Sequence, residues 1–191
     1  RGLGDVYKRQ HESMRTDARK RKFLEDAMHQ ALENHEFVMY LQPKYSISTC
    51  KMVGAEALVR WQHPEKGLIP PNDFIPIFEE NGFVIPLDEF MWEEACKLLA
   101  EWQREGKEML PISVNVSRRH LIDDYFVEVL NHLIEKYQIP KHYLEIEITE
   151  TEQSKMQERG IALLKENGYT LLMDDFGSGY STLNMLKDTQ F

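Results

Sequence analysis

The sequence predicts an α/β fold in which mainly parallel strands alternate with helices, as an open doubly wound sheet or a (β/α)₈ barrel. Short apolar runs typical of buried strands are separated by helical patterns. A parallel pair of strands needs a crossover of about a dozen residues or more, which these helices supply. Several strands also carry polar residues in their later part. This favours the barrel, because active groups of a barrel sit at the carboxyl ends of its strands.

The first part of the chain predicts a helical linker followed by two strands. Residues 1–10 fit nothing downstream and are interpreted as an artefact, while residues 14–34 form a charged helical stripe. The basic run within 15–22 could touch nucleic acid or membrane, but the acidic chain around it favours a solvated linker helix. The first strand is expected over 37–42, ended by Pro43, and the second over 51–61.

The rest of the chain predicts three further strands. A short helix capped by Asn72 or Asp73 is expected to end at Gly82. The later elements are expected in the order helix 88–105, strand 111–117, helix 121–137, strand 143–149, helix 153–167 and strand 170–175. A barrel usually takes about 250 residues, and this chain has 191. We therefore expect only about the first five strands of such a barrel.

Composition limits the classes of function. The formal net charge of −9 argues against binding a nucleic-acid polymer, which requires a basic face. A small anionic substrate remains possible, because a bound metal can reverse the local sign of charge. The two cysteines, without a CxxC spacing, and the absence of an apolar run of about 20 residues predict a cytoplasmic domain. A longer parent protein could still be membrane-anchored.

Four predicted strands carry a carboxylate or a carboxamide on their more polar face. Successive strand side chains point to opposite faces, so each of these groups can share a face with its neighbours. Buried carboxylates are very costly unless a cation meets them, and oxygen ligands suit Mg²⁺ or Mn²⁺. Taken singly, each has an ordinary explanation, such as an amide bonded to backbone or an acid on an edge strand. If the strands lie side by side, the polar face that includes Glu56, Asn115, Glu147 and Asp174 is a candidate metal site.

A set of motifs runs through the chain in a fixed order. They are Gln42-Pro43, Glu56-Ala57-Leu58, Arg60-Trp61, Phe74-Ile75-Pro76, Ser113-Val-Asn-Val-Ser117, Glu147-Ile-Thr-Glu150 and Asp174-Asp-Phe-Gly-Ser-Gly-Tyr-Ser181. Over about residues 37–186 the chain thereby resembles the EAL family of cyclic di-GMP phosphodiesterases. The resemblance implies a TIM-type barrel whose first strand is antiparallel to the rest. It also implies hydrolysis of cyclic di-GMP to linear pGpG, and it assigns 1–35 to artefact and linker and 36–191 to a partial EAL domain.

The resemblance implies a role for each matching residue. Two metal ions, Mg²⁺ or Mn²⁺, would be held by Glu56, Asn115, Glu147, Asp174 and Asp175, with Glu56 and Asp175 also catalytic. Substrate would contact Gln42, Leu58 and Arg60, and Glu150 would support the loop over 176–181. Ordinary alternatives remain for the second group: Arg60 in an ion pair with Glu56, Gln42 bonded at the Pro43 turn, and Leu58 as barrel filling.

The family pattern also restricts what these 191 residues are expected to do. Family members have an active-site Lys at the end of the sixth strand and a Glu beyond it, and the chain ends before either. We expect the fragment to be inactive and its full-length parent to be a phosphodiesterase. A silent cyclic di-GMP receptor is the alternative, and a barrel hydrolase acting on sugars is a further one. Expected partners are cyclic di-GMP, a second copy in a homodimer, and an upstream GGDEF or sensory domain.

Overall fold

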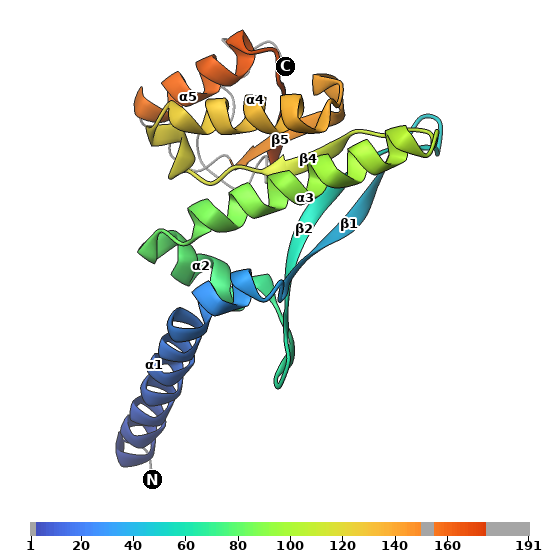
Figure 1. The fold of residues 1–191 in the computed structure, drawn as a ribbon. Coiled ribbons are helices and arrows are strands. Elements are labelled where there is room, and N and C mark those ends of the chain that lie inside the picture. The colour runs from blue at the N-terminus through green and yellow to red at the C-terminus, as the bar shows by residue number, and fades with distance from the viewer. Residues whose placement is uncertain (1–2, 150–154, 175–191) are drawn as a thin grey trace. The chain divides into compact units, whose positions relative to one another are not determined.

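The computed structural model describes residues 3–149 and 155–174, which fall into two compact units. The first holds the described residues up to Val38 together with Arg60–Phe83, and the second holds Met39–Val59 and the described residues from Val84 onward. The elements, drawn in Figure 1, are α1 (Leu3–Glu33), β1 (Phe37–Tyr45), β2 (Met52–His63), β3 (Gly67–Ile69), α2 (Pro71–Asn81), α3 (Val84–Arg104), β4 (Ile112–Asn115), the 3₁₀ helix η1 (His120–Ile122), α4 (Tyr125–Tyr137), the 3₁₀ helix η2 (Lys141–Tyr143), β5 (Leu144–Thr149), α5 (Lys155–Glu166) and β6 (Thr170–Asp174).

The described strands form one sheet in the order β1-β2-β4-β5-β6, with the short β3 beside β2. Strands β2, β4, β5 and β6 pair in parallel. A tight turn joins β1 to β2, in which the Ser46 amide donates to the Lys51 carbonyl at 2.9 Å. Two neighbouring strands joined by so short a turn run antiparallel. The α/β class, the five strands and the antiparallel first strand are thus confirmed, and β3 was not predicted.

Strand β1 continues through Pro43 to Tyr45, so the predicted end at Gln42 is wrong. Proline cannot donate a hydrogen bond to a neighbouring strand and is tolerated mainly on edge strands. Because β1 is the terminal strand in the described order, one row of its backbone groups has no neighbour in the sheet, and the proline fits there. This extension places Lys44 within the strand.

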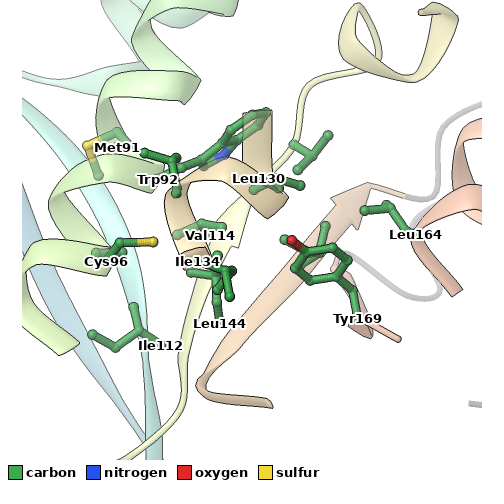
Figure 2. Close-up of a cluster of buried hydrophobic side chains, with 14 of the residues drawn as sticks. Met91, Trp92, Cys96, Ile112, Val114, Leu130, Ile134, Leu144, Leu164 and Tyr169 are labelled. Carbon is green, nitrogen blue, oxygen red and sulfur yellow. The ribbon is translucent and has the colours of Figure 1, made fainter. Parts of the chain in front are cut away.

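The core of the second unit lies where α3 packs against β4 and α4 (Figure 1). Figure 2 shows Trp92 and Cys96 of α3 in one cluster with Val114 of β4 and Leu130 of α4, and all four are buried. Burial raises the pKa of the Cys96 thiol to about 12. The other cysteine, Cys50, is exposed in the turn between β1 and β2.

The helix predicted over 121–137 is two elements, because the chain leaves η1 at Ile122 and α4 starts at Tyr125. The Asp123 carboxylate accepts the Tyr125 amide at 3.0 Å, a local bond that competes with a continuous helix. Tyr125 is exposed, and the buried face of α4 is carried by Phe126, Val127, Leu130, Leu133 and Ile134.

The first unit is held by an aromatic cluster. Trp61 stacks on Phe37 at a centroid distance of 4.9 Å, and Phe74 and Phe78 of α2 pack on the same two rings. The Trp61 indole donates to the Glu36 carboxylate at 2.9 Å, so the one polar group of the ring is satisfied. The packing of β3 follows from its pairing with β2, which sets Ile69 opposite Trp61.

The end of helix α2 was predicted correctly, but its start was not. It begins at Pro71 after Pro70 and has no side-chain cap, so the capping role expected for Asn72 or Asp73 is wrong. Proline is favoured in the first turn, because the amide it lacks would have no helical partner there. The predicted stop is confirmed, since Gly82 adopts a φ of +90°.

Two basic residues of α1 are paired with acidic residues of α2. Lys20 contacts Asp73 at 2.6 Å, and Arg21 contacts Glu80 at 2.6 Å. These pairs agree with a solvated helix in preference to a nucleic-acid contact. Among the residues described, none of the helices combines the length and apolar character that crossing a bilayer requires. The boundary expected between 35 and 36 stays a prediction.

Candidate functional site

The register of the parallel strands sets polar residues on one face of the second unit's sheet. Glu56 of β2 lies opposite Ser113 of β4, and Asn115 lies opposite Glu147 of β5. Residues at paired positions share a face, and so do residues two apart on a strand. The sequence-based expectation that Glu56, Asn115 and Glu147 share a face agrees with this register.

Two of the predicted ligands are in contact. The Asn115 amide nitrogen lies 3.4 Å from Oε1 of Glu56. Turning the amide by 180° would direct its oxygen toward the same place, since the two ends of a carboxamide are nearly alike in shape. The contact therefore shows that one carboxylate and one amide group, from β2 and β4, lie close enough to bind the same ion.

Glu147 has partners that the sequence did not suggest. Its Oε1 faces the Lys44 ammonium at 3.3 Å, and its Oε2 accepts a hydrogen bond from the Ser113 hydroxyl at 3.0 Å. Lys44 also donates to Ser113 at 2.7 Å. Ser113 shares the parity of Asn115, which could have indicated its position, but no spacing in the sequence indicates the contact of Lys44.

The contact from Lys44 to Glu147 also reports the shape of the sheet. In a flat sheet β1 and β5 would be three strand spacings apart, or about 14 Å. A direct contact across β2 and β4 requires the sheet to curve toward its polar face. Such curvature is what a barrel needs, and it concentrates the polar side chains.

Burial raises the free-energy cost of the charged groups on this face. Glu147 is only 7% exposed and Ser113 is fully buried. Burial also raises the pKa of Glu145, two residues earlier on the same strand face, while Lys44 lowers that pKa and Glu147 raises it. Two acids and one ammonium are thus close enough to affect one another.

The remaining predicted residues are placed as follows. Gln42 is exposed on β1, and Leu58 is half-buried on β2 with the parity of Glu56. Arg60 continues β2 with that parity but belongs to the first unit. Asp174 ends β6, with its backbone paired to Thr149 and two residues beyond Leu172, the partner of Glu147. Asp175, Glu150 and the loop over 176–181 lie outside the described residues.

Helix α3 fixes the backbone around Asn115. The Trp92 indole donates to the Asn115 carbonyl at 3.0 Å, and Oδ2 of Asp88 accepts the Ser117 amide at 3.0 Å. His120, only 4% exposed, stacks on Trp92 at 4.6 Å, and its Nε2 lies 3.5 Å from Oδ2 of Asp88 without making a hydrogen bond. These groups hold the end of β4, and the bond from Trp92 to Asn115 was not predicted from the sequence.

The donor set of this face fits a hard cation. Within the described part of the chain, no three His, Cys, Asp or Glu side chains could hold a metal ion by themselves. The expected set, however, includes the amide of Asn115 and two aspartates, of which Asp174 is described in its backbone only and Asp175 not at all. Carboxylate and amide oxygens are ligands for Mg²⁺ and Mn²⁺.

Gly54 permits the close approach of β2 and β4 beside Glu56. A Cβ at this position would lie 2.9 Å from the Pro111 carbonyl oxygen, which also accepts the Ala55 amide. Gly54→Ala is expected to lower the free energy of unfolding by about 1–3 kcal/mol, because it forces the two backbones apart. Urea unfolding would measure this.

The control for that substitution is Val53→Ala at the neighbouring, exposed position. Surface changes of this kind stay within about 0.5 kcal/mol. Equal stability of the Gly54→Ala protein and the wild type would contradict the close approach of the strands.

Comparison with known proteins places this chain in a family. The family model described as "EAL domain" matches residues 25–191. The chain therefore belongs to the EAL domain family, as its motifs predicted.

Three curated relatives illustrate the similarity. An uncharacterised protein of Synechocystis is 35% identical over 194 residues, which is 98% of this chain and 28% of that protein. MucR of Pseudomonas aeruginosa, named a bifunctional diguanylate cyclase/cyclic di-GMP phosphodiesterase, is 32% identical and shares 92% of this chain and 26% of its own. PdeR of Escherichia coli, named a cyclic di-GMP phosphodiesterase, is 34% identical over 86% of this chain and 25% of its own. The chain thus spans only about a quarter of these relatives.

Solved structures of EAL proteins are similar to this fold. The MucR phosphodiesterase in complex with c-di-GMP has a TM-score of 0.78 at 32% identity, over 86% of this chain and 68% of that one. The EAL enzyme Bd1971, bound to cAMP and cyclic di-GMP, has a TM-score of 0.82 at 30% identity, over 96% of this chain and 51% of that one.

Proposed function

We propose that this EAL domain binds cyclic di-GMP and that the longer protein hydrolyses it to linear pGpG with two divalent cations. One observation carries the proposal: carboxylate and amide groups of Glu56, Asn115 and Glu147 gather on one face of adjoining parallel strands. The family membership and the relatives named as phosphodiesterases support it.

Each predicted site residue has a part in this proposal. Mg²⁺ or Mn²⁺ would be held by Glu56, Asn115, Glu147, Asp174 and Asp175. Such ions, when bound, lower the pKa of water and stabilise the attacking and leaving oxygens of a phosphoryl displacement. The guanidinium of Arg60 is suited to a phosphate, with Gln42 and Leu58 beside the substrate and Glu150 supporting the following loop. Glu56 and Asp175 are proposed to be essential for turnover.

The proposal extends to the assembly of the longer protein. A relative named as both diguanylate cyclase and phosphodiesterase supports an upstream GGDEF or sensory domain. A homodimer remains part of the proposal. We expect the 191 residues alone to be inactive, because they lack the family's Lys and Glu beyond the fifth predicted strand.

Hydrolysis of cyclic di-GMP by a protein that completes the family domain tests the function. Chromatography should detect pGpG in Mg²⁺ or Mn²⁺ and none after chelation. Glu56→Gln and Glu147→Gln should each reduce the rate at least about a hundredfold, because each removes an anionic ligand. Glu128→Gln, on the exposed face of α4, is the matched control and should retain the rate.

The alternative is a receptor that binds cyclic di-GMP without cleaving it. The contact of Lys44 with Glu147 favours the receptor, since a protein cation already neutralises that acid. Binding measured by calorimetry without turnover in either metal would support the receptor and reject the enzyme. Failure to bind cyclic di-GMP at all would reject both.

A further inference from the structure

The Lys44 ammonium lies at the carboxylate where the proposed function requires a metal ion. It contacts Oε1 of Glu147 at 3.3 Å and the Ser113 hydroxyl at 2.7 Å. Ser113 in turn donates to Oε2 of Glu147 at 3.0 Å. Both oxygens of Glu147 therefore already have a partner from the protein.

Burial makes Glu147 depend on a neutralising cation. The Glu147 side chain is 9% exposed and the Lys44 side chain 29% exposed. A carboxylate so removed from water is strongly disfavoured unless a cation meets it. Lysine is a compact point charge on a flexible stem, which can swing away when another cation arrives.

We propose that Lys44 is a built-in counter-cation of the metal site, which neutralises Glu147 before metal binding and competes with the divalent ion for that carboxylate. The inference rests on the proposed function, because it presupposes that Glu147 is a ligand. A divalent ion at Oε1 must displace Lys44 or lie beside it, and two cations repel each other. Lys44 thereby weakens metal binding and keeps the site ordered without metal.

The face that Lys44 contacts carries a second acid. Glu145 lies on the same face of β5, two residues before Glu147. An ammonium displaced from Glu147 would therefore remain beside a strand face that carries another carboxylate.

A simpler role for Lys44 makes the opposite prediction. If it only oriented Glu147, its loss would weaken metal binding, since removing an orienting partner typically costs about 10–100-fold in metal affinity. A competing cation gives the reverse sign. The direction of the change in affinity therefore decides between the two roles.

The experiment measures Mn²⁺ binding to the full chain by electron paramagnetic resonance of the free ion. Lys44→Met and Lys44→Gln should each tighten the Kd for Mn²⁺ about tenfold, because the like charge is gone. Lys44→Gln keeps a hydrogen-bond donor for Ser113 and serves if the Met protein does not fold. Lys44→Arg keeps the cation and should bind as the wild type does. Lys97→Met, an exposed lysine of α3 paired with Glu94, is the matched control.

Thermal unfolding supplies a second readout. In EDTA, Lys44→Gln should melt below the wild type, and saturating Mn²⁺ should reduce or reverse that difference. Unchanged or weaker Mn²⁺ binding in both neutral variants, with binding intact in the wild type, would overturn the inference and leave the proposed function standing. A wild type that binds no Mn²⁺ would overturn the proposed metal site and the inference together.

Discussion

Replacing Trp92 by alanine should lower the free energy of unfolding by about 3–5 kcal/mol. The indole is fully buried in the cluster between α3 and β4. It stacks on His120 and donates to the Asn115 carbonyl at 3.0 Å. The substitution removes a fully buried indole ring and its hydrogen bond to the Asn115 carbonyl.

A second substitution separates the packing of Trp92 from its hydrogen bond. Trp92→Phe keeps most of the apolar volume but removes the indole donor to the Asn115 carbonyl, which should cost about 0.5–1.5 kcal/mol. Urea unfolding followed by circular dichroism measures both variants. Trp102→Phe, a half-buried tryptophan on the same helix, is the control and should lose less. Wild-type stability of Trp92→Phe would show that the bond to Asn115 contributes nothing.

The second large effect is a loss of stability in mild acid that depends on His120. Burial lowers the pKa of His120 from 6.5 to about 4, although a hydrogen bond with the backbone of Ile85 opposes this. Asp88, 3.5 Å away, is the acidic group that faces the ring. Because the pKa is lower in the folded state, the unfolded chain binds more protons between pH 6.5 and pH 4. Stability contributed by the neutral ring is therefore complete above pH 6.5 and is lost as the pH falls toward 4.

The size of this effect follows from the two pKa values. Between pH 7 and pH 5, protonation of the unfolded chain should destabilise the fold by about 2 kcal/mol. His120→Gln should remove this part of the pH dependence, whatever it does to stability at pH 7. Urea unfolding at both pH values measures the change, with His132→Gln on the exposed side of α4 as the control. Identical slopes for His120→Gln and the wild type would show that the buried ring is not the titrating group.

Five of the described strands were predicted from the sequence, and so was the face that Glu56 and Asn115 share, whereas β3 was not. Alternation alone set Glu56 and Asn115 on the polar side of their strands, and the register agrees. The predicted bounds of the elements were wrong where the surrounding structure overrode a local sequence pattern. Pro43 looked like an end because sequence does not show that β1 is terminal in the sheet. The start of α4 was placed too early. The hydrogen bond from the Tyr125 amide to the Asp123 carboxylate forms only in the non-helical backbone conformation at Asp123, which the sequence does not show.

The part of the site that was missed depends on long-range geometry. Lys44 reaches Glu147 across two intervening strands, and only the curvature of the sheet makes that possible. No spacing in the sequence encodes a contact between residues 44 and 147. The bond from Trp92 to Asn115 was missed for a related reason, since the sequence does not show which backbone carbonyl the indole of a helical tryptophan will meet.

The two cysteines differ in exposure, so their rates of chemical modification can report on unfolding of the chain. The thiol in the turn between β1 and β2 is open to solvent, whereas the thiol on α3 is shielded by the core and held protonated. Since the thiolate is the reactive form, a maleimide should modify Cys50 first. A dye could therefore be attached selectively at the turn between β1 and β2. Delayed alkylation of Cys96 would then time the separation of α3 from the sheet, without any engineered probe.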